Sequence, residues 1–83
     1  MSEQPLWDEM ELLMEEMRRW QKEKLLRLAQ RLVPTIIEDD LFQPNDFPVL
    51  ENHPEFRYEE GVLHGIQALE ASLRAMKSSK DSG

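Results

Sequence analysis

The sequence of 83 residues has no cysteine, few aromatic residues and little positive charge, and no apolar run approaches the roughly 18 residues of a membrane span. Without cysteine the chain forms no disulfide, thiolate metal site or cysteine nucleophile, which fits a reducing cytoplasm. Its 17 acidic residues outnumber its 10 basic ones, which argues against general nucleic-acid binding. The acidic first residues predict neither a secretory nor a transit signal. We therefore expect a cytoplasmic protein that binds neither nucleic acid nor membrane.

A first long helix is predicted over residues 6–32, which contain no glycine or proline and many strong helix formers. Pro5 suits the first position of a helix, so residues 1–5 are expected to form an N-terminal tail. Apolar side chains recur with heptad spacing along the first half of this helix, at Leu6, Met10, Leu13, Met17 and Trp20. This seam is long enough to receive a second helix, either from the same chain or from a dimer partner.

Residues 33–54 are expected to form a crossover, because they hold four of the five prolines and no basic residue. The segment also has many apolar side chains, which indicates that it folds back over a core. Thr35 with Glu38 has the spacing of a capping box, and Asp46 before Phe47 suits a second cap. The crossover should therefore contain two short helical turns.

A second long helix is predicted over residues 55–77, because Pro54 and the Asn52–Glu55 spacing suit a helix start. Its large side chains form one stripe: Tyr58, Val62, Ile66, Leu69, Leu73 and Met76. Small side chains form a neighbouring stripe: Gly61, Gly65, Ala68, Ser72 and Ala75. Glycine costs about 1 kcal/mol relative to alanine inside a helix, so we expect the first helix to approach closely along the small stripe. Residues 78–83 are expected to be a disordered tail.

These elements predict an all-α fold, an antiparallel helical hairpin with a proline- and acid-rich crossover, in a single domain over residues 6–77. The order of charges agrees, because an antiparallel pair brings Glu11 near Lys77 and Arg27 near Glu55. Three leucines outside the main faces indicate a further contact surface: Leu12, Leu26 and Leu63. Since a two-helix core is small, we expect a homodimer in which two hairpins form a four-helix bundle.

The chain offers little for catalysis. Glu60 and His64 share one helix face and the acidic run 38–40 lies upstream, but neither matches an established metal-ligand spacing. The basic run 18–31 carries its leucines on one face, which indicates a solvated basic surface rather than a nucleic-acid helix. We therefore assign no catalytic residue, no cofactor and no metal ligand. The alternative is a metal-dependent enzyme or metal-binding protein that uses Glu60, His64 and residues 38–40.

The sequence is most typical of a small acidic interaction, assembly or regulatory module. Methionine side chains adapt to different surfaces, so the methionine-rich seam of the first helix is the preferred binding site. The predicted partner is another protein, either a second copy or one with a basic surface. The residues assigned to partner binding are Met10, Leu13, Met14, Met17, Trp20, Gly61 and Gly65.

Overall fold

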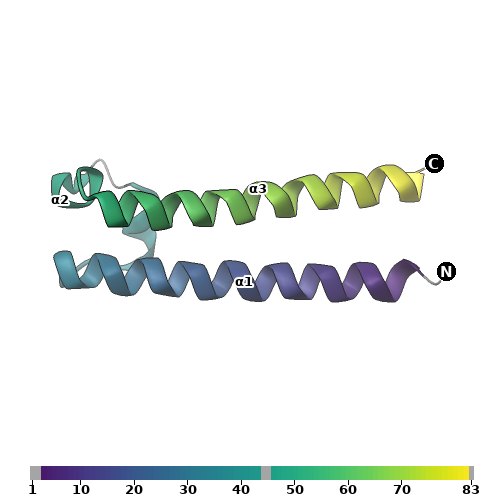
Figure 1. Ribbon diagram of the computed structural model, residues 1–83, viewed down its shortest axis with the longest axis horizontal. Coiled ribbons are helices and arrows are strands. Elements are labelled where there is room, and N and C mark those ends of the chain that lie inside the picture. The colour runs from purple at the N-terminus through teal and green to yellow at the C-terminus, as the bar shows by residue number, and fades with distance from the viewer. Residues whose placement is uncertain (1–2, 44–45, 83) are drawn as a thin grey trace.

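The computed structural model describes residues 3–43 and 46–82, and the regular elements among them are all helical. Helix α1 (Glu3–Leu32) and helix α3 (Pro54–Ser82) form two long arms that pack against each other. The arms run antiparallel, with the crossover at one end and the start of α1 beside the end of α3 at the other (Figure 1). The all-α prediction is confirmed, and the paired arms fit the predicted hairpin. The molecule is a rod that measures 49 × 19 × 18 Å.

Both arms are longer than the sequence predicted. Helix α1 begins at Glu3 and α3 ends at Ser82, so residues 3–5 and 78–82 are helical instead of forming tails. Pro5 is tolerated in the first turn, because the first amides of a helix have no acceptor within it. No proline or glycine interrupts α3 after Gly65. Some residues of the predicted tails and crossover lie outside the described residues: Met1, Ser2, Pro44, Asn45 and Gly83.

The crossover contains the two expected turns, the 3-10 helix η1 (Glu38–Phe42) and the short helix α2 (Pro48–Glu51). The carboxylate of Asp40, rather than the predicted Thr35, organises the first turn by accepting a 3.1 Å hydrogen bond from the Ile37 amide. Phe47, rather than the predicted Asp46, is the N-cap of the second turn, which Pro48 opens without a side-chain cap. Short turns with such local hydrogen bonds allow the chain to reverse direction within a proline-rich segment.

The start of α3 is capped by His53, which the sequence did not predict as a cap. His53 Nδ1 accepts a hydrogen bond of 3.3 Å from the amide of Phe56, in the first turn of α3. Asn52, the predicted cap, instead donates from its side chain to the carbonyl of Pro48 at 3.0 Å, at the end of α2. The imidazole therefore satisfies an amide that has no acceptor within the helix.

The hydrophobic core lies at the crossover end, where the segment between the arms folds back as predicted. Its buried side chains come from the end of α1, the crossover and the start of α3: Leu25, Leu28, Ala29, Ile36, Leu41, Leu50, Phe56 and Leu63. Leu63, which the sequence placed outside the main faces, is only 3% exposed. Complete burial of a large apolar side chain contributes about 1.5–3 kcal/mol, so this cluster supplies most of the stability.

Helix α1 is rotated by about one residue from the predicted orientation. Its inward face runs through Met14, Gln21 and Leu25, which are all buried, whereas Leu13 and Trp20 of the predicted seam are 57% and 60% exposed. The predicted seam ends at Trp20 and continues with heptad spacing into basic residues: Lys24, Arg27 and Arg31. Burying that seam would bring these charges toward the apolar core, and this penalty decides the rotation.

Helix α3 does not approach α1 through its small residues, so that prediction is wrong. A Cβ atom added at Gly61 or Gly65 would meet nothing within 4 Å. The inward face of α3 instead carries Phe56, Leu63 and Glu70, which are all buried. Burial of the large apolar side chains outweighs the gain that close packing of glycines would give.

Candidate protein interaction face

The open end of the hairpin, residues 3–18 of α1 with 66–82 of α3, is held by charged side chains. The Glu70 carboxylate, 3% exposed, receives two hydrogen bonds of 3.0 Å from Arg18 Nη1 and one of 3.4 Å from Arg74 Nη2. Lys77 Nζ lies 2.6 Å from Glu11 Oε1, so this predicted proximity is confirmed. The hydrogen bond from Lys77 lowers the pKa of Glu11 below its ordinary value.

The middle of the hairpin is held by a buried amide. Gln21 Nε2 donates to the backbone oxygen of Glu59 at 3.0 Å and to its Oε1 at 2.7 Å, and Lys24 Nζ lies 3.2 Å from Glu59 Oε2. The hydrogen bond from Gln21 is the main cause of a lowered pKa at Glu59, and Lys24 adds to it. No described buried side-chain nitrogen or oxygen lacks a hydrogen-bond partner.

These contacts fix the register of the two arms. Glu11 is level with Lys77 and Arg18 with Glu70, because both pairs are seven residues apart on each arm, and Lys24 reaches Glu59 from about one turn away. Polar pairs of this kind add little affinity compared with apolar burial, but they penalise a shifted register.

One broad side of the hairpin is apolar and has no partner within the chain. In an antiparallel pair of right-handed helices, residues that immediately precede inward-facing residues lie on the same side in both helices. Here those positions form a set that we call the apolar face: Leu6, Met10, Leu13, Met17 and Trp20 on α1 with Tyr58, Val62, Leu69 and Met76 on α3. Seven of these nine side chains are 48–69% exposed, and Met10 and Val62 are half-buried.

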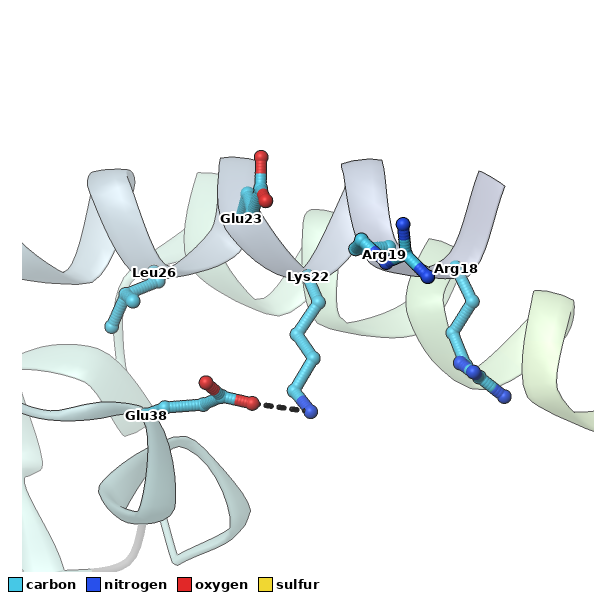
Figure 2. Close-up of a pocket in the computed structure, with 6 residues that line it drawn as sticks. All are labelled: Arg18, Arg19, Lys22, Glu23, Leu26 and Glu38. Atoms are coloured by element: carbon cyan, nitrogen blue, oxygen red, sulfur yellow. Dashed lines mark ion pairs between the residues drawn. The ribbon is translucent and has the colours of Figure 1, made fainter. Parts of the chain in front are cut away.

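The opposite side of the hairpin is covered at one end by the crossover. Figure 2 shows Lys22, which follows inward-facing Gln21, reaching down to the carboxylate of Glu38. The ammonium of Lys22 also lies 5.4 Å from the centre of the Phe42 ring. The crossover therefore leaves the apolar face uncovered and occupies the side opposite to it.

A shallow cavity of about 270 Å³ lies beside the crossover, lined by Arg18, Arg19, Lys22, Glu23, Leu26 and Glu38 (Figure 2). Its three cations are each paired with a carboxylate, those of Glu70, Glu15 and Glu38 respectively. This pairing neutralises the cavity, so the geometry does not favour an anionic ligand there. Within the basic run 18–31, Arg27 and Arg31 make no ion pair with another described residue.

The structure separates the residues assigned to partner binding into three groups. Leu13, Met17 and Trp20 are exposed on the apolar face, and Met10 is half-buried beside them. Met14 is 7% exposed and packs inward, so it is not available on the surface. The two glycines, Gly61 and Gly65, are exposed beside the face rather than forming it.

The sequence did not predict that three side chains of the apolar face are exposed, namely Tyr58, Leu69 and Met76. The sequence places all three in the large stripe of the second long helix without assigning them to the surface. Charge spacing offered a signal, because Glu55 precedes these residues with the same heptad spacing and is unsuited to the core.

The residues of the metal-site alternative do not converge. Glu60 pairs with Arg57 at 3.1 Å, Glu38 pairs with Lys22, and His64 is exposed. Among residues 3–43 and 46–82, no group of three or more His, Cys, Asp or Glu side chains is arranged to hold a metal ion.

Neither long arm, over the part of the chain that the structure describes, has the apolar stretch needed to cross a bilayer. Comparison of the chain with protein-family models, curated proteins and solved structures finds no match.

Proposed function

We propose that this protein is a small, non-catalytic interaction and assembly module of the cytoplasm, and that two copies associate through the apolar face to form a four-helix bundle. The observation that carries this proposal is the row of seven large apolar side chains, 48–69% exposed, on one side of the hairpin. Small monomeric proteins rarely leave so much contiguous apolar surface in water.

The size of the face supports a stable interface. One broad side of a rod of 49 × 19 Å presents roughly 900 Å², slightly more than the ~800 Å² that each partner buries in an interface of standard size. The face contains one tryptophan and one tyrosine, which are the residue types most often decisive for binding energy. Met10 and Met17 add flexible side chains that fill irregular gaps.

The small core supports a second copy as the partner. A hairpin of this size buries one apolar cluster at the crossover end and relies on polar contacts elsewhere. Helical hairpins of this kind commonly gain a full core by packing four helices around one axis. The apolar faces of two copies, placed together, would supply such a core along the open end.

Sedimentation equilibrium of the natural chain and of two matched variants tests this proposal. Leu13→Glu places a charge on the apolar face, whereas Leu12→Glu places the same charge on the neighbouring position, which is equally exposed but outside the face. We expect the natural chain and Leu12→Glu to sediment at twice 9.8 kDa at micromolar concentration. Leu13→Glu should sediment as a monomer, because an unpaired buried carboxylate is strongly unfavourable.

Two results would contradict the proposal. The natural chain could sediment as a 9.8 kDa species alone, which excludes self-association. Both variants could also weaken the dimer equally, which would show that a different surface holds it. Circular dichroism of each variant checks that its helices are intact.

A further inference from the structure

The apolar face carries a charge pattern at the crossover end that its large side chains do not explain. The heptad of the face continues on α1 through Lys24, Arg27 and Arg31, and it begins on α3 at Glu55. All four are exposed. None of the ion pairs among the described residues involves Arg27, Arg31 or Glu55. The face is therefore apolar along the open end and the middle of the rod. At the crossover end it carries three cations on α1 and, on α3, Glu55 followed by Tyr58.

When the two rods lie along each other, a two-fold axis can place them face to face in only two ways. An axis along the rod puts α1 of one copy over α3 of the other and keeps every residue at its own level. An axis across the rod turns one copy end over end, so that α1 lies over α1 and α3 over α3. Both arrangements are closed and use the same face on each copy.

The axis along the rod matches the surfaces of the two copies. Because Arg18 is level with Glu70 and Lys24 reaches Glu59 from about one turn away, Met17 of one copy comes within about one turn of Leu69 of the other. At the crossover end the same register brings Arg27 within about one turn of Glu55, with Arg31 one turn beyond. Along the open end apolar residues thus meet apolar residues. At the crossover end Tyr58 comes within about one turn of Lys24, whose ammonium an aromatic ring attracts, and Arg27 and Arg31 meet Glu55.

The axis across the rod does not match them. With the arms fully overlapped, Leu6 and Met10 of one copy lie opposite the turns of α1 that carry Lys24, Arg27 and Arg31. Sliding the copies until the apolar halves of α1 coincide moves Tyr58 and Val62 beyond the end of the other α3. Either choice leaves charges against apolar side chains or leaves part of the apolar face in water.

We propose that the two copies are related by a two-fold axis parallel to the helices, so that α1 of each copy packs against α3 of the other and all neighbouring helices are antiparallel. This inference rests on the proposed function and adds to it the orientation and register of the partner. Each α1 is then flanked by two α3 helices, one from its own chain, and lies diagonally across from the other α1.

The absence of cysteine makes disulfide mapping a clean test, because any disulfide must join introduced residues. Two single variants, Met17→Cys and Leu69→Cys, are prepared with different affinity tags and mixed so that chains exchange between dimers. The mixture is then mildly oxidised. The proposed arrangement places these two positions on neighbouring helices of different chains. Diagonal helices hold equivalent positions well beyond the ~7 Å Cα separation that a disulfide can span.

We expect disulfides that join the two variants to form. The yield of disulfides between two Met17→Cys chains or between two Leu69→Cys chains should not exceed the background. The background is set by mixing Leu69→Cys with Leu12→Cys, an exposed position outside the apolar face. Disulfides between equal chains in single variants at Leu6, Leu13 or Met17 would indicate adjacent α1 helices and overturn the proposed axis.

Sedimentation of the reduced mixture shows whether the chains associate at all, independently of how they are arranged. If the reduced mixture contains dimers but oxidation does not join Met17→Cys to Leu69→Cys, the arrangement is wrong while self-association stands. If the natural chain is monomeric, both the arrangement and the proposed function are overturned. Unchanged helical circular dichroism in each variant ensures that a missing disulfide reflects the arrangement and not a loss of folding.

Discussion

The two ends of the rod are stabilised in opposite ways. At the crossover end, the inward side chains of both arms are apolar and the short turns η1 and α2 close over them, so Leu25 and Phe56 are almost completely buried. At the open end, the inward contacts include Arg18 with Glu70 and Glu11 with Lys77. Several large apolar side chains of that end, among them Leu6, Leu13 and Leu69, point outward instead, although Met14 packs inward.

This difference separates folding from binding along the chain. A cluster of buried apolar side chains forms one folded unit within a single copy, because most of the free energy comes from apolar burial. Charged inward contacts hold the register but contribute little net free energy. The open end is therefore the part of the rod that would gain most from the proposed second copy, which its exposed apolar residues would contact.

Breaking the crossover end should have the largest effect. Phe56→Ala removes a fully buried aromatic side chain, and such substitutions cost about 3–5 kcal/mol. That loss approaches the whole stability of a domain this small, so the variant should lose most of its helical circular dichroism at 25 °C. Leu12→Ala, at a position 58% exposed, is the control and should change the melting temperature little. Retention of a cooperative melt near that of the natural chain would contradict the view that this cluster dominates folding.

Substitutions that break the contacts of the open end should lower the free energy of unfolding by less. Glu70→Ala leaves Arg18 and Arg74 without their shared carboxylate, and because both arginines reach solvent we expect a loss of about 1–3 kcal/mol in urea denaturation. Glu15→Ala removes only the exposed pair with Arg19 and should cost less than about 1 kcal/mol.

A double variant sharpens the same comparison. Replacing both partners, Arg18→Met with Glu70→Leu, should recover most or all of the stability that Glu70→Ala loses, since apolar groups often replace ion pairs at no cost. The outcome that counts against this account is a double variant less stable than Glu70→Ala. The polar contacts would then contribute to stability itself and not mainly to register.

Acid should weaken the contacts between the arms before it affects the apolar cluster. The pKa values of Glu59 and Glu11 lie below the ordinary 4.5 of a glutamate in the folded chain, mainly through hydrogen bonds from Gln21 and Lys77 respectively. Their contribution is therefore complete above pH 4.5 and is lost as the pH falls through the lowered values. Urea midpoints measured from pH 7 to pH 3 should fall, and the fall should be smaller in the variant Glu59→Gln. An identical fall in both proteins would assign the acid sensitivity to other carboxylates.

Much of the fold followed from local sequence, but the rotation of the arms did not. The proline-rich crossover and the helix-forming runs identify two antiparallel helices, because those signals depend on neighbouring residues alone. The rotation depends on residues far apart, since Leu25 and Phe56 must meet across the hairpin. Leu6 to Trp20 is a correct heptad that faces away from the core, and inward Gln21 and Glu70 resemble surface residues until their partners are in place.

The smallest expected effect concerns Gly65, an exposed residue within α3. An added Cβ there meets nothing within 4 Å, so Gly65→Ala should gain the helix propensity of alanine, about 1 kcal/mol, and raise the melting temperature. Gly65→Leu should stabilise the chain nearly as much, because the open space accepts a long side chain. Thermal melts under conditions where each variant has the oligomeric state of the natural chain provide the measurement. If leucine destabilises while alanine stabilises, a helix that the single hairpin does not contain packs closely at Gly65, and a second copy would have to supply it.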